Sequence, residues 1–272
     1  MITQNRLSVS ALAWSDQEEE DGFALLSSLD VRGVELLPPR IWKSCWGVEG
    51  YRARLSDHGL LPVAFQAIYY GLSEASLLGP EKEFSRFLDH TLRVAHLADD
   101  LGVPLGVFGA PSLRRLPSDI GSVADLGPER LSRLDAALQP FSFKLCIEPL
   151  TRDMGCEFLN TCGEVIEALD VIQARNLSAM LDTASAFSAG NNPVCELRHH
   201  KEHIAHLHLS EPSLASFETP SADYASLGQA FGEIPGNRVW ASIEMLRSGD
   251  QWQRDCRQAI TLMQEHFSPL PV

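Results

Sequence analysis

The chain has 272 residues, of which 44% are hydrophobic and 21% are charged, a composition typical of a globular protein with a full core. Its 36 acidic and 22 basic residues give a formal net charge of −14, which argues against a protein that binds nucleic-acid phosphates. No run approaches the roughly 20 apolar residues of a membrane helix, and the polar segment Met1–Arg6 does not resemble a signal peptide. We therefore expect neither a nucleic-acid partner nor a membrane partner.

The six cysteines are scattered along the chain without any C-x-x-C pair. Several lie in apolar runs, where cysteine behaves as a small hydrophobic residue. This pattern predicts a reducing, cytoplasmic location, with neither a disulfide framework nor a zinc–cysteine site.

Short apolar runs of strand length alternate along the chain with longer segments of helical periodicity. The clearest helix spans Pro80 to Leu101 and is followed by Gly102, a residue typical of a helix end. A capping box, Thr161-Cys-Gly-Glu164, predicts the start of another helix. Further helices are expected from about Pro128 to Leu138 and from about Trp252 to Met263. The predicted strands are Ser8–Trp14, Gly33–Leu37, Leu61–Ile68, Val103–Phe108, Phe143–Glu148, Ser178–Asp182, Ile204–Ser210 and Val239–Met245.

This alternation, repeated eight times, predicts an α/β fold of the (β/α)8 TIM-barrel type, with a parallel eight-stranded barrel and outer helices, as a single domain over residues 1–272. An open doubly wound sheet is the alternative, but it usually carries a G-x-G-x-x-G turn, which this chain lacks. Long connections follow strand ends, as expected where barrel active sites form. They are Gly109–Gly127, Pro149–Asn160, Thr183–Pro193 and Glu211–Ala222.

Side-chain alternation along the strands indicates which residues point into the barrel. In the last strand the apolar residues Val239, Ala241 and Ile243 should face the helices, which directs Glu244 inward. The same reasoning applied to the other strands directs inward Glu35, Glu148, Asp182 and His208. Glu148, Asp182, His208 and Glu244 are therefore expected to meet at the mouth of the barrel, with Glu35 nearby.

Several carboxylates cannot share a dry cavity unless cations or protons compensate them. Taken singly, each acid could equally be a helix cap or a surface charge. Together, one imidazole and several carboxylates suit Mn²⁺ or Mg²⁺, with Zn²⁺ and Co²⁺ as alternatives. The convergence of four such residues on successive strands favours a metal site.

Other polar or aromatic residues have two interpretations each. Trp14 and Gln66 end predicted strands and suit either the pocket or the core. His206, one layer below His208, is interpreted as a hydrogen-bonded core histidine. Arg114 and Arg115 suit a solvated loop better than an anion site.

The chain resembles the xylose isomerase-like TIM-barrel superfamily, in its sugar phosphate isomerase/epimerase branch. The resemblance is carried by segments that cover nearly the whole chain in order, among them GVELLPPRIW, PVAFQAIYYG, CIEPL, AMLDT, IAHLHLSEP and ASIEM. It implies one divalent metal, Mn²⁺ foremost, held by residues from the last four strands. The matching positions are Glu148, Asp182, His208 and Glu244, the same set that strand alternation brings together.

The resemblance also implies an isomerase or epimerase that acts on a sugar, a keto-sugar or a sugar derivative. Proton abstraction next to a carbonyl would give a metal-stabilised enediolate. Glu148 and Glu244, on opposite sides of the substrate carbon, would remove and return the proton. A small carbohydrate is then the expected partner, and a homo-oligomer is common in the superfamily.

Two positions depart from the pattern of the ketose 3-epimerases in this superfamily. Ser185 stands where a substrate-binding His is expected, and Leu214 stands where an Arg is expected. A standard ketohexose is therefore doubtful as the substrate. The candidate substrate-binding residues are Glu35, Gln66, Trp14, Ser185 and Arg247. A carboxylate or phosphate group could instead be received by Arg152, Arg247 or the Arg114–Arg115 pair.

Three alternatives stay open. A metal-dependent lyase or dehydratase acting on a polyol or keto-sugar would use the same metal and base. A non-catalytic sugar-binding barrel is the alternative outside enzymes. An apurinic-site endonuclease is disfavoured, because it needs extra His ligands where this chain has Glu35, Gln66 and Phe108–Gly109, and because of the net charge of −14.

Overall fold

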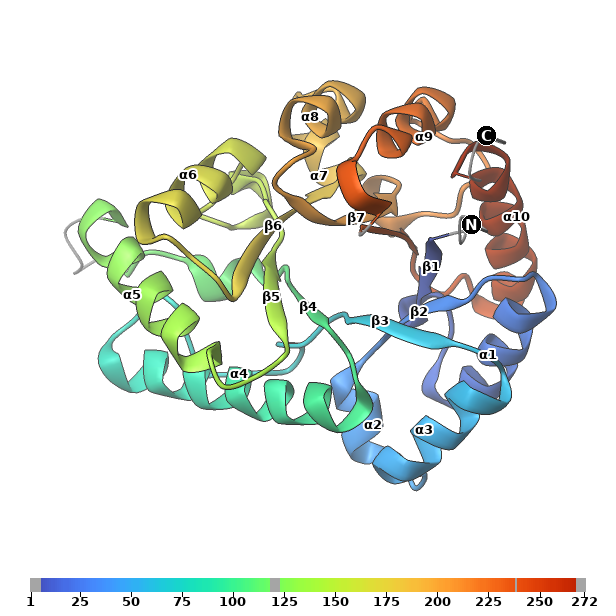
Figure 1. Cartoon of the computed structure of the whole chain (residues 1–272), viewed down its shortest axis with the longest axis horizontal. Coiled ribbons are helices and arrows are strands. Elements are labelled where there is room, and N and C mark those ends of the chain that lie inside the picture. Colours follow the sequence, from blue (N-terminus) through green and yellow to red (C-terminus); the bar gives the residue numbers. More distant parts are fainter. Residues whose placement is uncertain (1–5, 118–122, 238, 268–272) are drawn as a thin grey trace.

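The computed structural model describes residues 6–117, 123–237 and 239–267. Eight parallel strands pair in chain order, and β8 pairs back with β1 to close the barrel. The helices surround the strands as an outer layer (Figure 1). The predicted (β/α)8 barrel is therefore confirmed. Within these described ranges, no helix is both long enough and apolar enough to cross a membrane.

The barrel strands are short, and their bounds fall within the predicted apolar runs, except that β1 and β6 each start one residue earlier. They are β1 (Leu7–Ser10), β2 (Gly33–Leu36), β3 (Leu61–Phe65), β4 (Leu105–Phe108), β5 (Lys144–Ile147), β6 (Leu177–Asp182), β7 (Ile204–Ser210) and β8 (Trp240–Glu244). The helices are α1 (Glu19–Ser28), α2 (Pro38–Lys43), α3 (Gly47–Asp57), α4 (Glu81–Leu101), α5 (Val123–Leu138), α6 (Cys162–Ile172), α7 (Thr183–Ser188), α8 (Pro193–His200), α9 (Tyr224–Gly232) and α10 (Trp252–Phe267).

The long helix α4 follows the apolar periodicity that predicted it. Phe84 and Phe87 on its inner face are fully buried, and the helix ends at Gly102 with φ of 72°. Pro80 lies one residue outside the helix, as its N-cap, because its ψ of 156° is extended. Such caps and apolar faces are local signals, which explains why the sequence predicted this helix well.

Two short elements differ from the sequence expectation. β1 ends at Ser10, and Ala11–Ala13 form a 3-10 turn instead of continuing the strand to Trp14. The expected loop Thr183–Pro193 contains α7, whose first turn is capped by the Asp182 side chain. Part of the expected loop Gly109–Gly127, residues 118–122, lies outside the described residues.

The barrel interior is layered. Val107, Cys146 and Met180 form a small apolar cluster that is separate from the main core between strands and helices. The strand register pairs Met180 with His206 and, two residues on, Asp182 with His208. Polar side chains therefore occupy the layers toward the carboxyl ends of the strands, the end where barrel active sites form.

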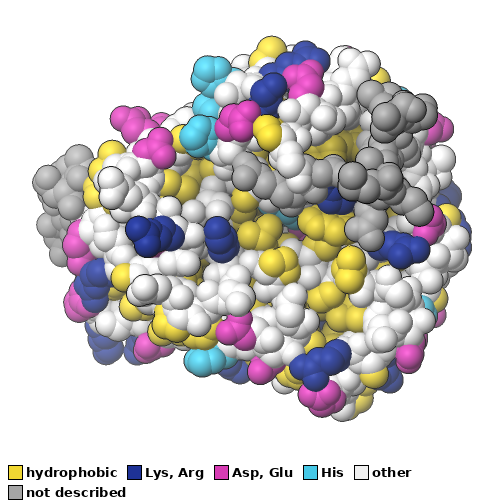
Figure 2. Space-filling view, viewed as in Figure 1, with side chains coloured by type: hydrophobic (Ala, Val, Ile, Leu, Met, Phe, Trp, Pro, Cys, Tyr) yellow, Lys and Arg dark blue, Asp and Glu magenta, His cyan; other side chains and the backbone are white. Residues whose placement is uncertain are grey.

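Charged residues are mixed on the surface that Figure 2 shows. Lys and Arg side chains are interspersed with Asp and Glu around the periphery, and hydrophobic side chains lie toward the centre. The described basic side chains on this face therefore form no extended basic patch.

Candidate metal centre

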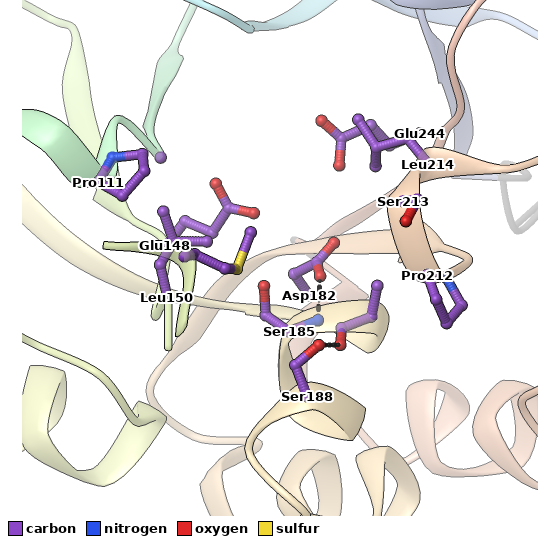
Figure 3. Close-up of a pocket in the computed structure, with 13 residues that line it drawn as sticks. Pro111, Glu148, Leu150, Asp182, Ser185, Ser188, Pro212, Ser213, Leu214 and Glu244 are labelled. Carbon is purple, nitrogen blue, oxygen red and sulfur yellow. Dashed lines mark hydrogen bonds between the residues drawn. The ribbon is translucent and has the colours of Figure 1, made fainter. Parts of the chain in front are cut away.

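Four side chains from consecutive strands meet at the carboxyl end of the barrel. Glu148 directly follows β5, Asp182 ends β6, His208 lies in β7 and Glu244 ends β8. One potential ligand atom from each lies within 4.8 Å of those of the others. The His208 Nδ1 atom is 3.1 Å from Glu244 Oε2 and 3.9 Å from Asp182 Oδ2. Glu148 and Glu244 approach from opposite sides of the cavity, with Asp182 between them (Figure 3).

Two of the three carboxylates are held by hydrogen bonds. Asp182 accepts from Ser210 Oγ at 2.5 Å and from the backbone N–H of Ser185 at 2.6 Å. Glu244 accepts from the side-chain amide of Gln66, whose own oxygen accepts from the backbone N–H of Ala67. These bonds orient both carboxylates toward the shared space and leave other oxygen lone pairs to face it.

The Glu148 carboxylate is positioned differently. No hydrogen bond to its oxygens is found among the residues that the structure describes. A methyl group on Gly109 would lie 2.1 Å from Glu148 Oε2, so the carboxylate occupies space that only a glycine leaves open. Glu148 is therefore packed against the loop that follows β4, and its oxygens are available to bind an ion or to accept a proton.

The buried carboxylates of the site repel one another, and the shifts of their pKa values show this repulsion. Burial, reinforced by Asp182 and Glu244, raises the pKa of Glu148 well above its usual range. Burial and Glu244 also raise the pKa of Asp182. Burial alone would lower the pKa of His208, but Glu244 and Glu35 outweigh it and raise that pKa. A cation among three carboxylates would remove this repulsion, so the donor set fits a hard divalent ion such as Mn²⁺.

Glu35 lies beneath this cluster and is fully buried. Its Oε1 atom accepts hydrogen bonds from the Nε2 atoms of His206 at 2.5 Å and His208 at 3.2 Å. Burial alone would raise the pKa of Glu35, but the two imidazoles lower it. His206 is thus a hydrogen-bonded histidine inside the barrel, as the sequence indicated.

Arg114 is a buried structural cation that sequence reasoning placed wrongly in a solvated loop. It donates hydrogen bonds to the backbone carbonyls of Glu148 at 2.9 Å, Leu159 at 3.3 Å and Gly109 at 3.3 Å. It thereby joins the loops after β4 and β5, from which Gly109 and Glu148 enter the site. Because its partners are backbone carbonyls, and those of Glu148 and Leu159 lie 34 and 45 residues away in the sequence, no side-chain pattern could reveal this role.

A cavity of about 410 Å³ opens above the four residues and is lined by Glu148, Asp182 and Glu244. Its walls are largely apolar, with Leu150, Met154 and Leu214 among them. A second cavity of about 360 Å³ shares Gly109 and Glu148 with the first, and its other lining residues include Ile68, Tyr69 and Tyr70. No Lys or Arg is among the described residues that line either cavity.

The sequence pattern of one protein family, described as xylose isomerase-like TIM barrel, matches residues 23–261. The chain belongs to this family. No curated protein matches the chain closely enough to count as a relative.

Solved structures of sugar epimerases and of an AP endonuclease share the fold at low sequence identity. D-psicose 3-epimerase from Clostridium cellulolyticum H10 is 13% identical with a TM-score of 0.77, over 97% of this chain and 100% of that one. 3-Keto-D-glucoside 4-epimerase from E. coli is 14% identical with a TM-score of 0.77, over 95% and 100%. An AP endonuclease of family 2 from Brucella melitensis is 18% identical with a TM-score of 0.73, over 92% and 96%. At these identities the likeness shows the fold alone.

Of the predicted substrate-binding residues of this xylose isomerase-like barrel, some line a cavity and the others do not. Ser185 and Leu214, the two positions that depart from the ketose 3-epimerase pattern, both line the first cavity, and Gln66 lines the second. Glu35 does not reach either cavity, because its carboxylate is engaged by the two histidines below.

Two of the predicted pocket residues belong elsewhere. Trp14 is fully buried, its indole packs 6.0 Å from that of Trp252, and its Nε1 donates to Glu19 at 3.0 Å. Arg247 forms an ion pair with Glu18 at 2.6 Å and lines neither cavity. Trp14 therefore takes the core position that was the second interpretation of its place in the sequence, and neither cavity supports a substrate-binding role for Arg247.

Proposed function

We propose that this protein is a divalent-metal-dependent isomerase or epimerase of an uncharged keto-sugar or keto-sugar derivative. The observation that carries the proposal is the convergence of three carboxylates and one imidazole on one cavity, with Glu148 and Glu244 on opposite sides of it. Two structural neighbours are a D-psicose 3-epimerase and a 3-keto-D-glucoside 4-epimerase, which supports the same reaction class.

The residues that would hold the metal are Glu148, Asp182, His208 and Glu244. A bound divalent ion supplies a Lewis acid that polarises the substrate carbonyl and stabilises negative charge on its oxygen. Asp182, fixed by Ser210 and Ser185, contributes a rigid charge and takes no part in proton transfer.

Glu148 and Glu244 then divide the proton transfer between them. One carboxylate removes the proton from the carbon next to the carbonyl, and the electron pair of the broken C–H bond passes into the carbonyl group. The other carboxylate returns a proton from the opposite side. Return to the same carbon inverts its configuration and gives epimerisation. Return to the former carbonyl carbon gives isomerisation, in which the neighbouring hydroxyl becomes the new carbonyl and its proton passes to the former carbonyl oxygen.

The lining of the cavities favours a substrate without a phosphate or carboxylate group. Arg114 donates to backbone carbonyls and Arg247 pairs with Glu18, so neither is available to an anion. Arg115 donates to the backbone carbonyl of Gly155 at 3.4 Å, and Arg152 is exposed. With three carboxylates in the first cavity and apolar walls around them, an anionic substrate group would lack a described partner.

Elemental analysis tests the metal. Protein purified without added metal, then loaded with Mn²⁺ and desalted, should carry one divalent ion per chain, and His208→Ala should lose it. The control His199→Ala, an exposed histidine on α8, should keep the ion. Equal metal content in wild type and His208→Ala contradicts the site.

A substrate screen in deuterated water tests the reaction. The metal-loaded enzyme is incubated with uncharged keto-sugars, sugar phosphates and sugar acids, and products are read by NMR. We expect solvent deuterium at one carbon of an uncharged keto-sugar or its derivative. Loss of water from the substrate would instead indicate a dehydratase, and preferential turnover of a sugar phosphate or sugar acid would contradict the uncharged substrate.

A further inference from the structure

Glu35 and two histidines form a hydrogen-bonded group at the floor of the metal centre. Glu35 and His208 are both fully buried, although they lie far apart in the sequence, on β2 and β7. We infer that Glu35 is a positioning residue that holds the His208 ring so that Nδ1, and not Nε2, faces the metal. This inference rests on the metal site of the proposed function.

The hydrogen-bond chemistry of Glu35 fixes the proton on each histidine. An ionised carboxylate only accepts hydrogen bonds, so each imidazole nitrogen that contacts Glu35 Oε1 must carry a hydrogen. Those nitrogens are Nε2 of His206, at 2.5 Å, and Nε2 of His208, at 3.2 Å. Nε2 of His208 therefore carries a hydrogen whether or not the ring is charged, and Nδ1 is the only ring nitrogen that could present a lone pair to a metal.

The surroundings of His208 Nδ1 indicate which atoms this nitrogen faces. The atom is buried and has no hydrogen-bond partner among the described residues. It faces oxygens of Glu244 at 3.1 Å and Asp182 at 3.9 Å. A lone pair directed at carboxylate oxygens is unfavourable unless a proton or a metal ion lies between them. The lone pair is therefore directed at the place that the metal would take.

His206 supports the same arrangement from below. Its short hydrogen bond holds the Glu35 carboxylate, and its ring lies 5.2 Å from that of His208 at an interplanar angle of 79°. A carboxylate that accepts the far N–H of a metal-binding histidine fixes the ring and makes the ligand nitrogen more basic. Removal of the Glu35 charge should therefore weaken metal binding without touching a ligand.

The first test reads the tautomer in the wild-type protein, so it does not depend on the folding of a variant. Nitrogen-15 NMR of histidine-labelled protein is recorded without metal and with diamagnetic Zn²⁺ or Mg²⁺, and His208→Ala assigns the His208 signals. We expect hydrogen on Nε2 of His208 and a metal-dependent shift of Nδ1. Hydrogen on Nδ1 with the metal effect on Nε2 would overturn the inference.

The second test compares two buried glutamates. Glu35→Gln keeps the shape of the side chain but removes its charge, and the control Glu19→Gln does the same to a buried glutamate that pairs with Arg40. We expect Glu35→Gln to lower Mn²⁺ affinity in isothermal titration calorimetry by roughly 10–100-fold, and Glu19→Gln to leave it unchanged. A folded Glu35→Gln protein with wild-type affinity would contradict the inference.

The outcomes separate this inference from the proposed function. If the wild-type chain binds no divalent ion, the proposed function fails, and the positioning role of Glu35 fails with it because there is no metal toward which His208 is held. If Glu35→Gln does not fold, the wild-type NMR result stands as the deciding measurement. If metal binds but affinity is insensitive to Glu35, the metal site survives and the positioning role is rejected.

Discussion

Gly109 shows how one missing side chain shapes the site. A Cβ atom there would lie 2.1 Å from Glu148 Oε2, so Gly109→Ala must displace the carboxylate. We expect this change to weaken Mn²⁺ binding by about tenfold, or about 1.4 kcal/mol. The control Gly163→Ala in α6, which meets no atom within 4 Å, should bind like wild type. Unchanged affinity in Gly109→Ala would show that Glu148 is not a ligand in this position.

The cysteines divide by burial into reactive and inert thiols. Cys45 and Cys195 are exposed, whereas burial raises the pKa of Cys146, Cys162 and Cys256 to about 12. Because the thiolate is the reactive form, iodoacetamide at pH 8 should modify the two exposed cysteines in the folded protein. The buried cysteines should react only after denaturation. At pH 9 they should still be unreactive in the folded protein, because their thiols remain protonated well below a pKa of about 12. Peptide mass spectrometry measures this, and modification of Cys146 in native protein would contradict the barrel packing.

Some residue roles were readable from the sequence and others were not. Strand alternation brought Glu148, Asp182, His208 and Glu244 to one place because side-chain direction within a strand is a local property. The pairing of Glu35 with His206 could not be predicted, because it depends on where β2 and β7 stand around the barrel.

At the scale of elements, the contact between α9 and α10 depends on close approach. A Cβ on Gly228 of α9 would lie 2.0 Å from the backbone oxygen of His266 in α10. Gly228→Ala should therefore force the helices apart and lower the free energy of unfolding by about 1–3 kcal/mol. Chemical denaturation monitored by circular dichroism measures the effect.

The same helix offers a matched control for this prediction. Gly232 ends α9, and a Cβ there meets no atom within 4 Å. Gly232→Ala should leave stability unchanged or raise it slightly, because alanine has the higher helix propensity. Equal effects of the two substitutions would refute close packing as the reason for Gly228.

The bounds of helices and strands could be predicted where the signals for them lie within the element itself, and not where such signals are weak. α4 was predicted almost to the residue, because its apolar face and Gly102 are encoded within the helix itself. The apolar run Ser8–Trp14 did not distinguish a strand from the 3-10 turn that follows it after Ser10. α7 is not predicted, because six residues carry too little periodicity, although a helix cap is one of the two interpretations that the sequence gives to Asp182.

At the scale of the whole molecule, the metal should contribute to stability. The site concentrates three carboxylates in a chain whose net charge is already −14. A ligand that binds only the folded state raises the free energy of unfolding by about 2.7 kcal/mol at a concentration of 100 times Kd. Differential scanning calorimetry should show a Tm that rises with Mn²⁺ and falls again with a chelator.

The His208→Ala variant checks that this stabilisation arises at the proposed site. Its Tm should not respond to the same Mn²⁺ concentrations, whereas that of the His199→Ala control should rise as in wild type. A Mn²⁺-dependent rise in His208→Ala equal to that of wild type would place the stabilising ion elsewhere.

In the proposed reaction, Glu148 and Glu244 exchange one substrate proton from opposite sides of the cavity. Its most direct measurement is deuterium incorporation by Glu148→Gln and Glu244→Gln, each checked for metal content, with the substrate that the screen identifies. Wild type should convert the substrate with solvent deuterium at one carbon, and neither metal-loaded variant should achieve net conversion. Conversion at the wild-type rate by either variant, or product without solvent deuterium, would contradict it.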